Sequence, residues 1–344
     1  MEKQKIGIAM SGGVDSTACA LLLREKYKVH GFFMQLAQPD FAEQLQRVQS
    51  IADKCDIPLQ VIDLRSQFQE KVLHYFSTSY HNGSTPNPCM VCNPEIKFGL
   101  FMDAVIAQGM EKVATGHYTN IVEKNGCLYL QQGKDVRKDQ SYFLARLSQK
   151  QLGRVLFPLG NMLKNEVYDF VETQGFTDFR GQESQDICFL GTESIGSFLQ
   201  KQDDGTSPAG DIVNTAGEIL GKHNGICNYT IGQRKGLGIS AAAPLYVIQI
   251  DAKHNRIIVG GDDELFRDAI EIKDLLWNCD EKLTTDQSYR VRIRYGHHGG
   301  EANIEHLPEK RCRILFKEKQ RAVTRGQFAV IYDQDLILGS GEII

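Results

Sequence analysis

A glycine-rich loop between a strand-like segment and a helix-like segment is the strongest constraint on this 344-residue chain. Residues 5–10 are largely apolar, residues 18–23 have apolar residues at helical spacing, and Ser11-Gly12-Gly13-Val14-Asp15-Ser16 lies between them. Backbone N–H groups at a helix N-terminus form an anion site when glycines open the loop. Hydroxyls and a carboxylate in the same loop suit a pyrophosphate with Mg²⁺. We therefore expect a nucleotide phosphate site, although a tight turn that needs glycines only for its shape is the competing interpretation.

Strand-like and helix-like segments alternate after this loop. Short apolar runs at 29–34, 59–64 and 113–115 predict strands, and the spacing at 45–51 and 98–106 predicts helices. Alternation of this kind is typical of parallel strands joined by crossover helices. The sequence therefore predicts an α/β fold with a doubly wound parallel sheet, in a first domain that spans residues 1–195.

The pattern changes after a polar, turn-rich joint at 203–208. Short β-like segments separated by glycines follow, and the chain is almost entirely β-like after Asp262. Alternation at 289–295 places Arg290, Arg292 and Arg294 on one strand face, with Val291 and Ile293 toward a core. We expect a small mixed central domain at 196–262 and a C-terminal β-barrel at 263–344.

Charge is distributed unevenly along the chain. Residues 290–325 hold ten Lys or Arg and four acidic residues, a local balance of +6, while the whole chain carries −4 and the remainder therefore about −10. A basic segment of this kind suits a polyanion, but it is also compatible with an ordinary solvated face of a barrel. No run of eighteen apolar residues and no signal peptide is present, so we expect a cytoplasmic protein without a membrane span.

Eight of the nine cysteines fall into two groups. Five have apolar or β-rich neighbours and are interpreted as small core residues: Cys19, Cys55, Cys127, Cys279 and Cys312. Cys89 and Cys92 lie in a proline-rich segment, and Cys188 lies in a polar loop. We expect Cys92 to lie just ahead of a helix, where the helix dipole and Lys97 would lower its thiol pKa. A zinc site is not expected because no second C-x-x-C follows.

Several motifs in a fixed order then indicate a family. They are S-G-G-V-D-S at 11–16, T-P-N-P-C-M-V-C-N-P-E-I-K-F at 85–98, G-H-Y at 116–118, K-D-Q-S-Y-F-L at 138–144, D-I-C-F at 186–189 and Y-T-I-G-Q-R-K-G-L-G at 229–238. Together they resemble the tRNA-specific 2-thiouridylases, a family of the ATP pyrophosphatase (PP-loop) superfamily. The similarity covers nearly the whole chain.

This resemblance implies ATP-dependent 2-thiolation of the wobble uridine of tRNA. Cys92 matches the family's nucleophile and Cys188 its persulfide carrier. Residues that match ATP-binding positions are Ala9, Met10, Ser11, Gly12, Gly13, Val14, Asp15, Ser16, Met34 and Gly116. Residues that match positions in contact with the target base or with tRNA are Asn87, Pro88, Cys89, His117, Lys138, Asp139, Gln140, Arg294, Tyr295 and Gln327.

The implied chemistry needs two activations. Transfer of AMP to O2 of the base, with Mg²⁺ at the phosphates, converts a poor electrophile into a good one. A persulfide on Cys188 then supplies sulfur, and the Cys92 thiolate takes over the sulfur–sulfur bond. The central domain and the barrel would contact tRNA, and a cysteine desulfurase or a sulfur-relay carrier would supply the persulfide sulfur.

Some alternatives remain open at this point. Cys89 stands where some relatives carry an aspartate, which leaves the acid/base group unassigned, and Cys89, Cys92 and Cys188 together could instead ligate an iron–sulfur cluster. The segments after Met34 and Cys188 also depart from the family pattern. His117 is compatible with a core histidine, and Arg290 and Arg292 with plain surface charges. Another PP-loop enzyme, such as an amidotransferase, and a non-catalytic tRNA-binding paralogue are the rival functions.

Overall fold

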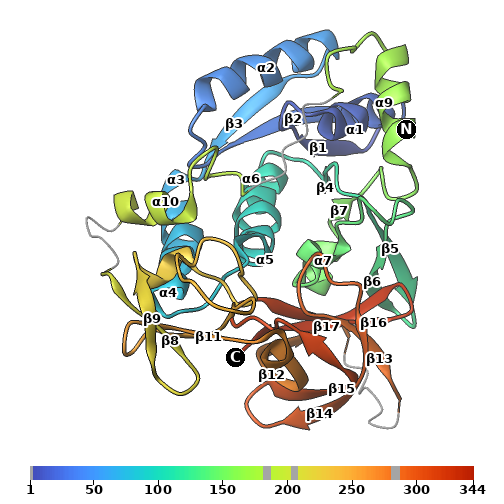
Figure 1. The fold of residues 1–344 in the computed structure, drawn as a ribbon. Helices are drawn as coiled ribbons and strands as arrows, with labels where there is room; N and C mark the ends of the chain where they lie inside the picture. Colours follow the sequence, from blue (N-terminus) through green and yellow to red (C-terminus); the bar gives the residue numbers. More distant parts are fainter. Residues whose placement is uncertain (1–2, 181–186, 203–207, 280–286) are drawn as a thin grey trace.

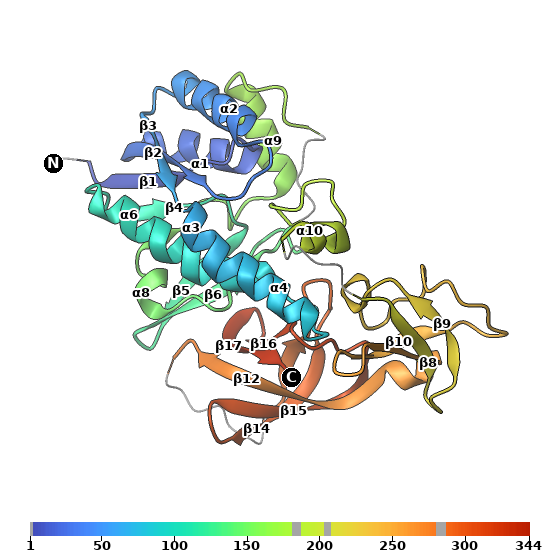
Figure 2. The same cartoon turned by 90° about the vertical axis from the view of Figure 1, so that its left-hand side faces the viewer.

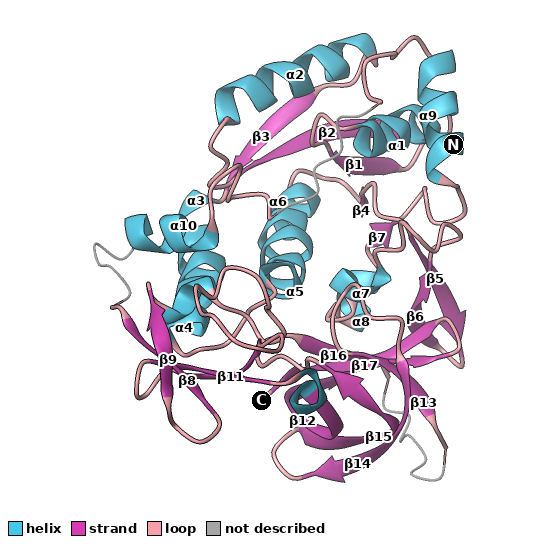
Figure 3. Ribbon diagram, in the orientation of Figure 1, coloured by secondary structure: helices cyan, strands magenta, loops and turns pink. Residues whose placement is uncertain are grey.

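A computed structural model describes residues 3–180, 187–202, 208–279 and 287–344 of the chain. Three sheets organise it (Figures 1 and 3). A parallel sheet lies at the top of Figure 1, a β-barrel at the bottom, and a smaller sheet at the lower left. Helical segments between residues 65 and 107 stand between the parallel sheet and the barrel in both views (Figures 1 and 2). The predicted joint at 203–208 lies outside the described residues except for Pro208.

The N-terminal sheet confirms the predicted doubly wound arrangement. Its order is β3-β2-β1-β4-β7 and all its pairings are parallel. Ile6 and Ile8 of the central strand are fully buried, and Gly7 between them lies so close to Val105 that a Cβ would come within 2.3 Å of its methyl carbon. The strands are β1 (Lys5–Ala9), β2 (Lys28–Gln35), β3 (Leu59–Asp63), β4 (Lys112–Ala114) and β7 (Val155–Leu156).

Two helical layers cover this sheet. One packs with Ile6 and Ile8 and contains α1 (Val14–Arg24), α2 (Phe41–Lys54) and α9 (Lys164–Thr173). The other packs with Phe32 and Val113 and continues into the cores of the central sheet and the barrel. Its segments are α3 (Arg65–Phe68), η1 (Gln69–Leu73), α4 (His74–His81), α5 (Pro88–Cys92), η2 (Asn93–Phe101) and α6 (Met102–Ala107).

The helix predicted at 98–106 is part of a longer helical run from Pro88 to Ala107. Its middle, η2, is a π-helix, a form that often occurs at functional sites. Gly99 permits this turn, because a Cβ there would lie 2.7 Å from the carbonyl oxygen of Pro94. The run is continuous, so the cysteine pair 89 and 92 lies within its first turns and not ahead of it.

The central sheet has the order β10-β11-β8-β9. Its core residues, among them Ile212, Val247 and Ile257, belong to the same apolar cluster as the helical layer behind the parallel sheet. The elements are α10 (Ile195–Gln202), β8 (Gly210–Asn214), β9 (Ile219–His223), η3 (Ile226–Asn228), β10 (Tyr246–Asp251), β11 (Arg256–Gly260) and η4 (Asp262–Leu265).

Six antiparallel strands form the predicted C-terminal barrel, in the order β12-β15-β14-β13-β16-β17, and the pairing of β12 with β17 closes it. Val291 and Ile293 are buried, which confirms the expected alternation at 289–295. The strands are β12 (Phe266–Trp277), β13 (Tyr289–Arg292), β14 (Gly300–Leu307), β15 (Arg311–Arg321), β16 (Phe328–Asp333) and β17 (Leu336–Ile343).

A hairpin from the N-terminal half extends the barrel sheet. It consists of β5 (Thr119–Lys124) and β6 (Cys127–Gln132), and β6 pairs with β17 through Gln131 and Leu336. A disulfide between Cys127 and Cys279, with Cα atoms 6.2 Å apart, joins this hairpin to the segment after β12. The interpretation of these two cysteines as small core residues was therefore wrong. They are bonded to each other across 152 positions of the chain, and the neighbours of each cysteine in the sequence do not reveal such a pairing. Cys19, Cys55 and Cys312 are buried as expected.

No helix among the described residues is long and apolar enough to cross a membrane.

Candidate active site

The glycine-rich loop lies at the carboxyl end of β1, beside the point between β1 and β4 where the strand order reverses, and ligands of parallel sheets generally bind at such a point. Gly12 has a φ of +78°, a conformation that a glycine adopts without strain. The hydroxyl of Ser16 accepts from the Ser11 N–H at 3.2 Å and donates to the Gly13 carbonyl at 3.0 Å. These bonds fix the loop, and no side chain caps α1 at Gly13, so its N-terminus is available to an anion.

Asp15, the carboxylate of this loop, is held by two side chains. Lys164 Nζ lies 2.8 and 2.9 Å from its two oxygens, and the Tyr118 hydroxyl donates to Oδ1 at 2.7 Å. The Lys164 side chain is 10 % exposed and that of Asp15 33 %, so the pair is open to a ligand from the side of the carboxylate. A cation and an anion thus lie together where the nucleotide phosphates were predicted.

Lys164 was missed by the sequence reasoning. It is the first residue of α9, its backbone N–H donates to Asp135 Oδ2 at 3.1 Å, and its ammonium lies over the rings of Tyr118 and Tyr168. No local motif marks it, since its role depends on a partner 149 positions away. Only the packing of α9 against α1 places it at the loop.

The loop after β4 lies directly against Asp15. A Cβ on Gly116 would come within 2.7 Å of Asp15 Cβ, so only glycine allows this approach. The ring of the following residue, His117, has its Nδ1 at 2.7 Å from Thr115 Oγ1 and its Nε2 at 3.4 Å from Lys97 Nζ. An ammonium group can only donate, so Nε2 accepts and the proton is on Nδ1. Burial and the neighbouring Lys97 lower the pKa of His117 well below its usual value, so the ring is neutral.

Met34 lies near the carboxyl end of β2, the neighbour of β1. Its carbonyl accepts from Gln38 Nε2 at 2.8 Å, and Gln38 Oε1 accepts from the Leu36 N–H at 2.7 Å. The predicted ATP-binding positions therefore all lie at the carboxyl ends of three adjacent strands, β2, β1 and β4, in the loops that follow them, or in the first turn of α1.

Cys89 and Cys92 lie on α5, and the expectation of a lowered thiol pKa at Cys92 was wrong. Burial raises the pKa of Cys92 to about 12 and that of Cys89 to about 11, while the nearby Lys97 acts in the opposite direction. The helix begins at Pro88, so Cys92 is one turn inside it and away from the N-terminal N–H groups. Both thiols are therefore protonated in the resting protein.

Cys188, about a hundred positions away, interacts electrostatically with both of these thiols and with Lys97. It is exposed, although the protein around its sulfur raises its pKa. The next residue, Phe189, is buried against the rings of Phe68, Phe76 and Phe198. This aromatic anchor positions Cys188; Asp186 of the same motif lies outside the described residues.

Metal ligation finds limited support in the part of the chain that the structure describes. No group of three or more His, Cys, Asp or Glu side chains among the described residues is arranged to hold a metal ion. Oxygen donors suited to Mg²⁺ are present in the loop: the Asp15 carboxylate and the hydroxyls of Ser11 and Ser16.

The segment 138–140 is held by hydrogen bonds to other parts of the fold. Asp139 is 3 % exposed and accepts from Gly133, Ser141 and Arg292, and Gln140 Oε1 accepts from the Tyr118 N–H at 3.1 Å. Asp139 and Gln140, both predicted to contact tRNA, therefore make internal bonds, and Lys138, which precedes them, is half-buried.

The arginine at the end of β13 and the one that follows it differ in their surroundings. Arg292 has a side chain that is 12 % exposed, pairs with Asp139 at 3.4 Å and lies over the ring of Tyr142, so it is not a plain surface charge. Arg294 is half-buried and donates to the carbonyl of Arg321 at 3.3 Å. Tyr295 is 37 % exposed and stacks on Phe143 with centroids 4.4 Å apart.

Acidic residues outside the basic segment neutralise part of it. Arg313 pairs with Glu271 at 2.8 Å and Arg321 with Asp262 at 2.7 Å. Because both acidic partners precede residue 290, a count along the sequence overstates the charge of this face.

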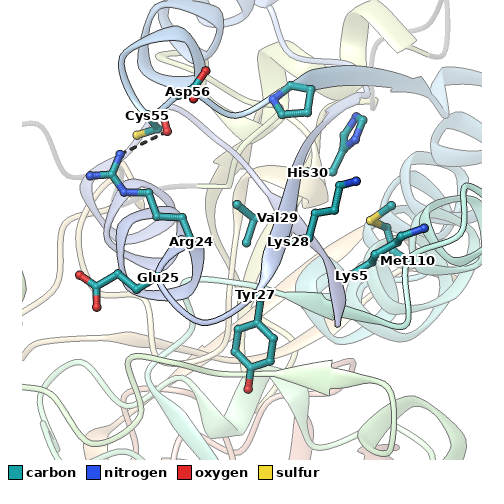
Figure 4. A pocket seen from close by; sticks show the side chains of 11 residues that line it. Lys5, Arg24, Glu25, Tyr27, Lys28, Val29, His30, Cys55, Asp56 and Met110 are labelled. Atoms are coloured by element: carbon teal, nitrogen blue, oxygen red, sulfur yellow. Dashed lines mark hydrogen bonds between the residues drawn. The ribbon is translucent and has the colours of Figure 1, made fainter. Parts of the chain in front are cut away.

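A pocket of about 580 Å³ lies at the opposite, amino ends of β1 and β2 (Figure 4). Lys5 and Lys28 line it with Arg24, whose Nη1 donates to the Cys55 carbonyl at 3.2 Å. It is separated from the glycine-rich loop by the length of the strands, so it is not part of the site described above.

Comparison with known proteins adds three matches to family models. Residues 4–192 match a model described as tRNA methyl transferase HUP domain, residues 196–261 one described as tRNA methyl transferase PRC-barrel domain, and residues 267–343 one described as aminomethyltransferase β-barrel domain.

Full-length curated relatives carry one common name. The tRNA-specific 2-thiouridylase MnmA of Desulfotalea psychrophila is 51% identical over 344 residues, which is 100% of both chains. The protein of the same name from Syntrophomonas wolfei is 41% identical over 98% of this chain and 99% of its own. A tRNA-specific 2-thiouridylase MnmA 2 of Clostridium botulinum is 38% identical over 100% of this chain and 99% of its own.

Proposed function

This chain belongs to the tRNA-specific 2-thiouridylases, which are sulfurtransferases. From that membership we propose that it uses ATP to adenylate O2 of the wobble uridine of tRNA and then replaces that oxygen with sulfur from a cysteine persulfide. One observation supports the proposal: close packing, a hydrogen bond and electrostatic interactions link the glycine-rich loop to three thiols. Asp15 packs against Gly116, and the next residue, His117, is hydrogen-bonded to Lys97. The charge of Lys97 in turn lowers the pKa values of Cys89, Cys92 and Cys188, against the effect of burial.

The adenylation step would take place at the glycine-rich loop. O2 of the base attacks the α-phosphorus of ATP, the bond to the β-phosphate oxygen breaks, and pyrophosphate leaves. Bound with the nucleotide at Asp15, Ser11 and Ser16, Mg²⁺ would supply neutralisation of phosphate charge. The N–H groups at the start of α1 and the ammonium of Lys164, which lies at Asp15, would stabilise the departing pyrophosphate.

The sulfur step would follow at the cysteines. The terminal sulfur of a Cys188 persulfide attacks C2 of the base and AMP leaves. The Cys92 thiolate then attacks Cys188 Sγ, so that the sulfur–sulfur bond of the persulfide breaks and sulfur remains on the base. A Cys92–Cys188 disulfide forms, and a dithiol reductant must reopen it before the next cycle.

The exposure of Cys188 supports delivery of sulfur by a protein donor, such as a cysteine desulfurase or a relay carrier. We assign the catalytic role to residues 1–195 and tRNA contact to 196–262 and 263–344. On this assignment the tRNA surface includes Arg294 and the exposed Tyr295, whose ring can stack on a base.

The deciding assay combines the protein with ATP, unmodified tRNA and a persulfide donor, followed by mass analysis of the nucleosides and of the nucleotide products. We expect 2-thiouridine, AMP and pyrophosphate, each dependent on tRNA. Formation of ADP, or absence of 2-thiouridine with all components present, would reject the proposal.

The iron–sulfur alternative is separated by anaerobic purification with iron and sulfide counts. We expect full thiolation by metal-free protein and retained thiolation in Cys89→Asp. Activity that appears only after cluster reconstitution would overturn the persulfide route.

A further inference from the structure

Thr85, the first residue of the T-P-N-P motif, is hydrogen-bonded to both the barrel and the central domain. Its carbonyl accepts from Gln327 Nε2 at 2.8 Å, and its N–H donates to the carbonyl of Arg325 at 2.8 Å. Its hydroxyl donates to the Thr230 hydroxyl at 3.3 Å. The first two partners precede β16 of the barrel, and the third belongs to the segment between η3 and β10. All three polar groups of Thr85 are therefore used by residues far away in the sequence.

The barrel residues that hold Thr85 are themselves fixed. Gly326 has a φ of +85°, and a Cβ there would lie 3.0 Å from Ser84 Cβ and 3.1 Å from the Thr85 carbonyl oxygen. Gly326 N–H donates to the Ile343 carbonyl at 3.0 Å, and Ile343 N–H donates to the Gln327 carbonyl at 2.8 Å. Residues 326 and 327 are thus anchored to the last strand of the barrel.

Thr230 is anchored in the same way. Its N–H donates to Gln233 Oε1 at 3.1 Å, and the Val247 N–H at the start of β10 donates to the Gln233 carbonyl at 2.9 Å. Hydrogen bonds within the Y-T-I-G-Q motif therefore hold Thr230 against the central sheet, with its hydroxyl next to that of Thr85.

The catalytic helix begins three residues after Thr85. Pro86 and Pro88 are both buried, and Asn87 between them is the N-cap of α5, which carries Cys89 and Cys92. Proline fixes φ at two of these three positions, so the segment is stiff. A shift at Thr85 is therefore transmitted to the two thiols and not absorbed by the chain between them.

We propose that Gln327 is a positioning residue: its amide fixes Thr85 and, together with Thr230, couples the docking of tRNA on the barrel and the central module to the placement of Cys89 and Cys92. This inference rests on the proposed function. It also gives Gln327, whose position in the family pattern implies a tRNA contact, a structural contact instead, because one N–H of its amide is bonded to the Thr85 carbonyl.

The test compares Gln327→Met, which keeps the length of the side chain and removes the donor, with Thr230→Val, which removes the hydroxyl from the other module. We expect both variants to lower kcat for thiolation by about ten- to a hundredfold, because small misplacements of reacting groups have effects of that size. We expect the Kd for tRNA to stay within about twofold, and the alkylation rate of Cys92 in the tRNA-free protein to change in both. Gln49→Met, the same substitution on the exposed face of α2, serves as the matched control.

A raised Kd for tRNA with unchanged kcat in Gln327→Met would show a tRNA contact and overturn the proposal. Unchanged kcat and unchanged Cys92 alkylation in both variants would overturn it as well. If Gln327→Met fails to fold, Thr230→Val decides alone by the same measurements. The alkylation readout needs no tRNA, so it stays informative even if the wild-type protein does not thiolate tRNA, which would count against the proposed function instead.

Discussion

Lys164 and Asp15 form a bidentate ion pair at the glycine-rich loop, with Nζ 2.8 and 2.9 Å from the two carboxylate oxygens. The aromatic rings of Tyr118 and Tyr168 shield the ammonium, and the Tyr118 hydroxyl binds the same carboxylate. In the absence of a nucleotide the loop thus has its own counter-ion. A phosphate that enters beside Asp15 meets a cation already in place, which is the arrangement expected of a preorganised site.

Lys164→Met should lower tRNA-dependent pyrophosphate release by about a hundredfold, because one preorganised cation at the phosphates is lost. The free energy of unfolding should also fall by about 1–3 kcal/mol, since Asp15 loses the partner of a partly buried pair. Pyrophosphate assays and urea unfolding measure the two effects. Lys134→Met is the matched control: its pair with Glu166 is about half exposed and screened by solvent, so this substitution should change stability far less than Lys164→Met. Wild-type pyrophosphate release in Lys164→Met would contradict the assignment.

Cys92→Ser and Cys188→Ser should each abolish 2-thiouridine formation while the Kd values for ATP and tRNA stay within about twofold, since the thiols act after the substrates bind. Nucleoside mass analysis and equilibrium binding provide the measurements. Cys55→Ala, which removes a buried thiol with no role in the site, should retain thiolation. Wild-type thiolation in either serine variant would refute the role given to that cysteine.

Alkylation of Cys92 should accelerate with pH by about tenfold per unit between pH 7 and 10. Burial raises the pKa of this thiol to about 12, so the thiolate fraction is small and grows tenfold with each unit over the whole range. In Lys97→Met the alkylation of Cys92 should be slower than in the wild type at the same pH, because the cation that lowers the pKa of this thiol is removed. Mass spectrometry of iodoacetamide-treated protein follows the rate. A plateau near pH 8.5 would indicate an ordinary exposed thiol.

Reduction of the Cys127–Cys279 disulfide should lower the free energy of unfolding by about 2–4 kcal/mol, the usual contribution of a native disulfide. The protein should stay folded, because Gln149 Nε2 donates to the carbonyls of both Leu128 and Asn278, the neighbours of the two cysteines. Thermal unfolding with and without dithiothreitol, together with mass counting of alkylated thiols, provides the check. Equal stability of oxidised wild type and Cys127→Ser would contradict the expected contribution.

Affinity for tRNA should fall steeply with salt, and Arg294→Ala should weaken it. If Arg294 neutralises one phosphate, the slope of log affinity against log salt concentration should decrease by about 0.7–0.9. Titrations at several salt concentrations measure both quantities. Arg313→Ala is a suitable comparison, because Arg313 pairs with Glu271 on the barrel surface. An unchanged slope and affinity in Arg294→Ala would place the tRNA surface elsewhere.

The glycine-rich loop and the parallel sheet around it were predictable because their signals are local. Glycines, a carboxylate and hydroxyls follow one apolar strand, and helix-like and strand-like spacings alternate over short windows. The same holds for residues 289–295, whose alternation correctly placed Val291 and Ile293 in the core. The order of the motifs along the chain was enough to indicate the family.

Roles that depend on distant partners could not be predicted from the local sequence. Lys164 reaches Asp15 only because α9 packs against α1, and Cys127 meets Cys279 only because the hairpin β5–β6 joins the barrel sheet. The Cys92 pKa follows from burial, which local helix position does not reveal. The sequence by itself determined the chemistry of each segment and its local geometry. The tertiary structure decided which segments meet, because burial and pairing are set by the whole chain.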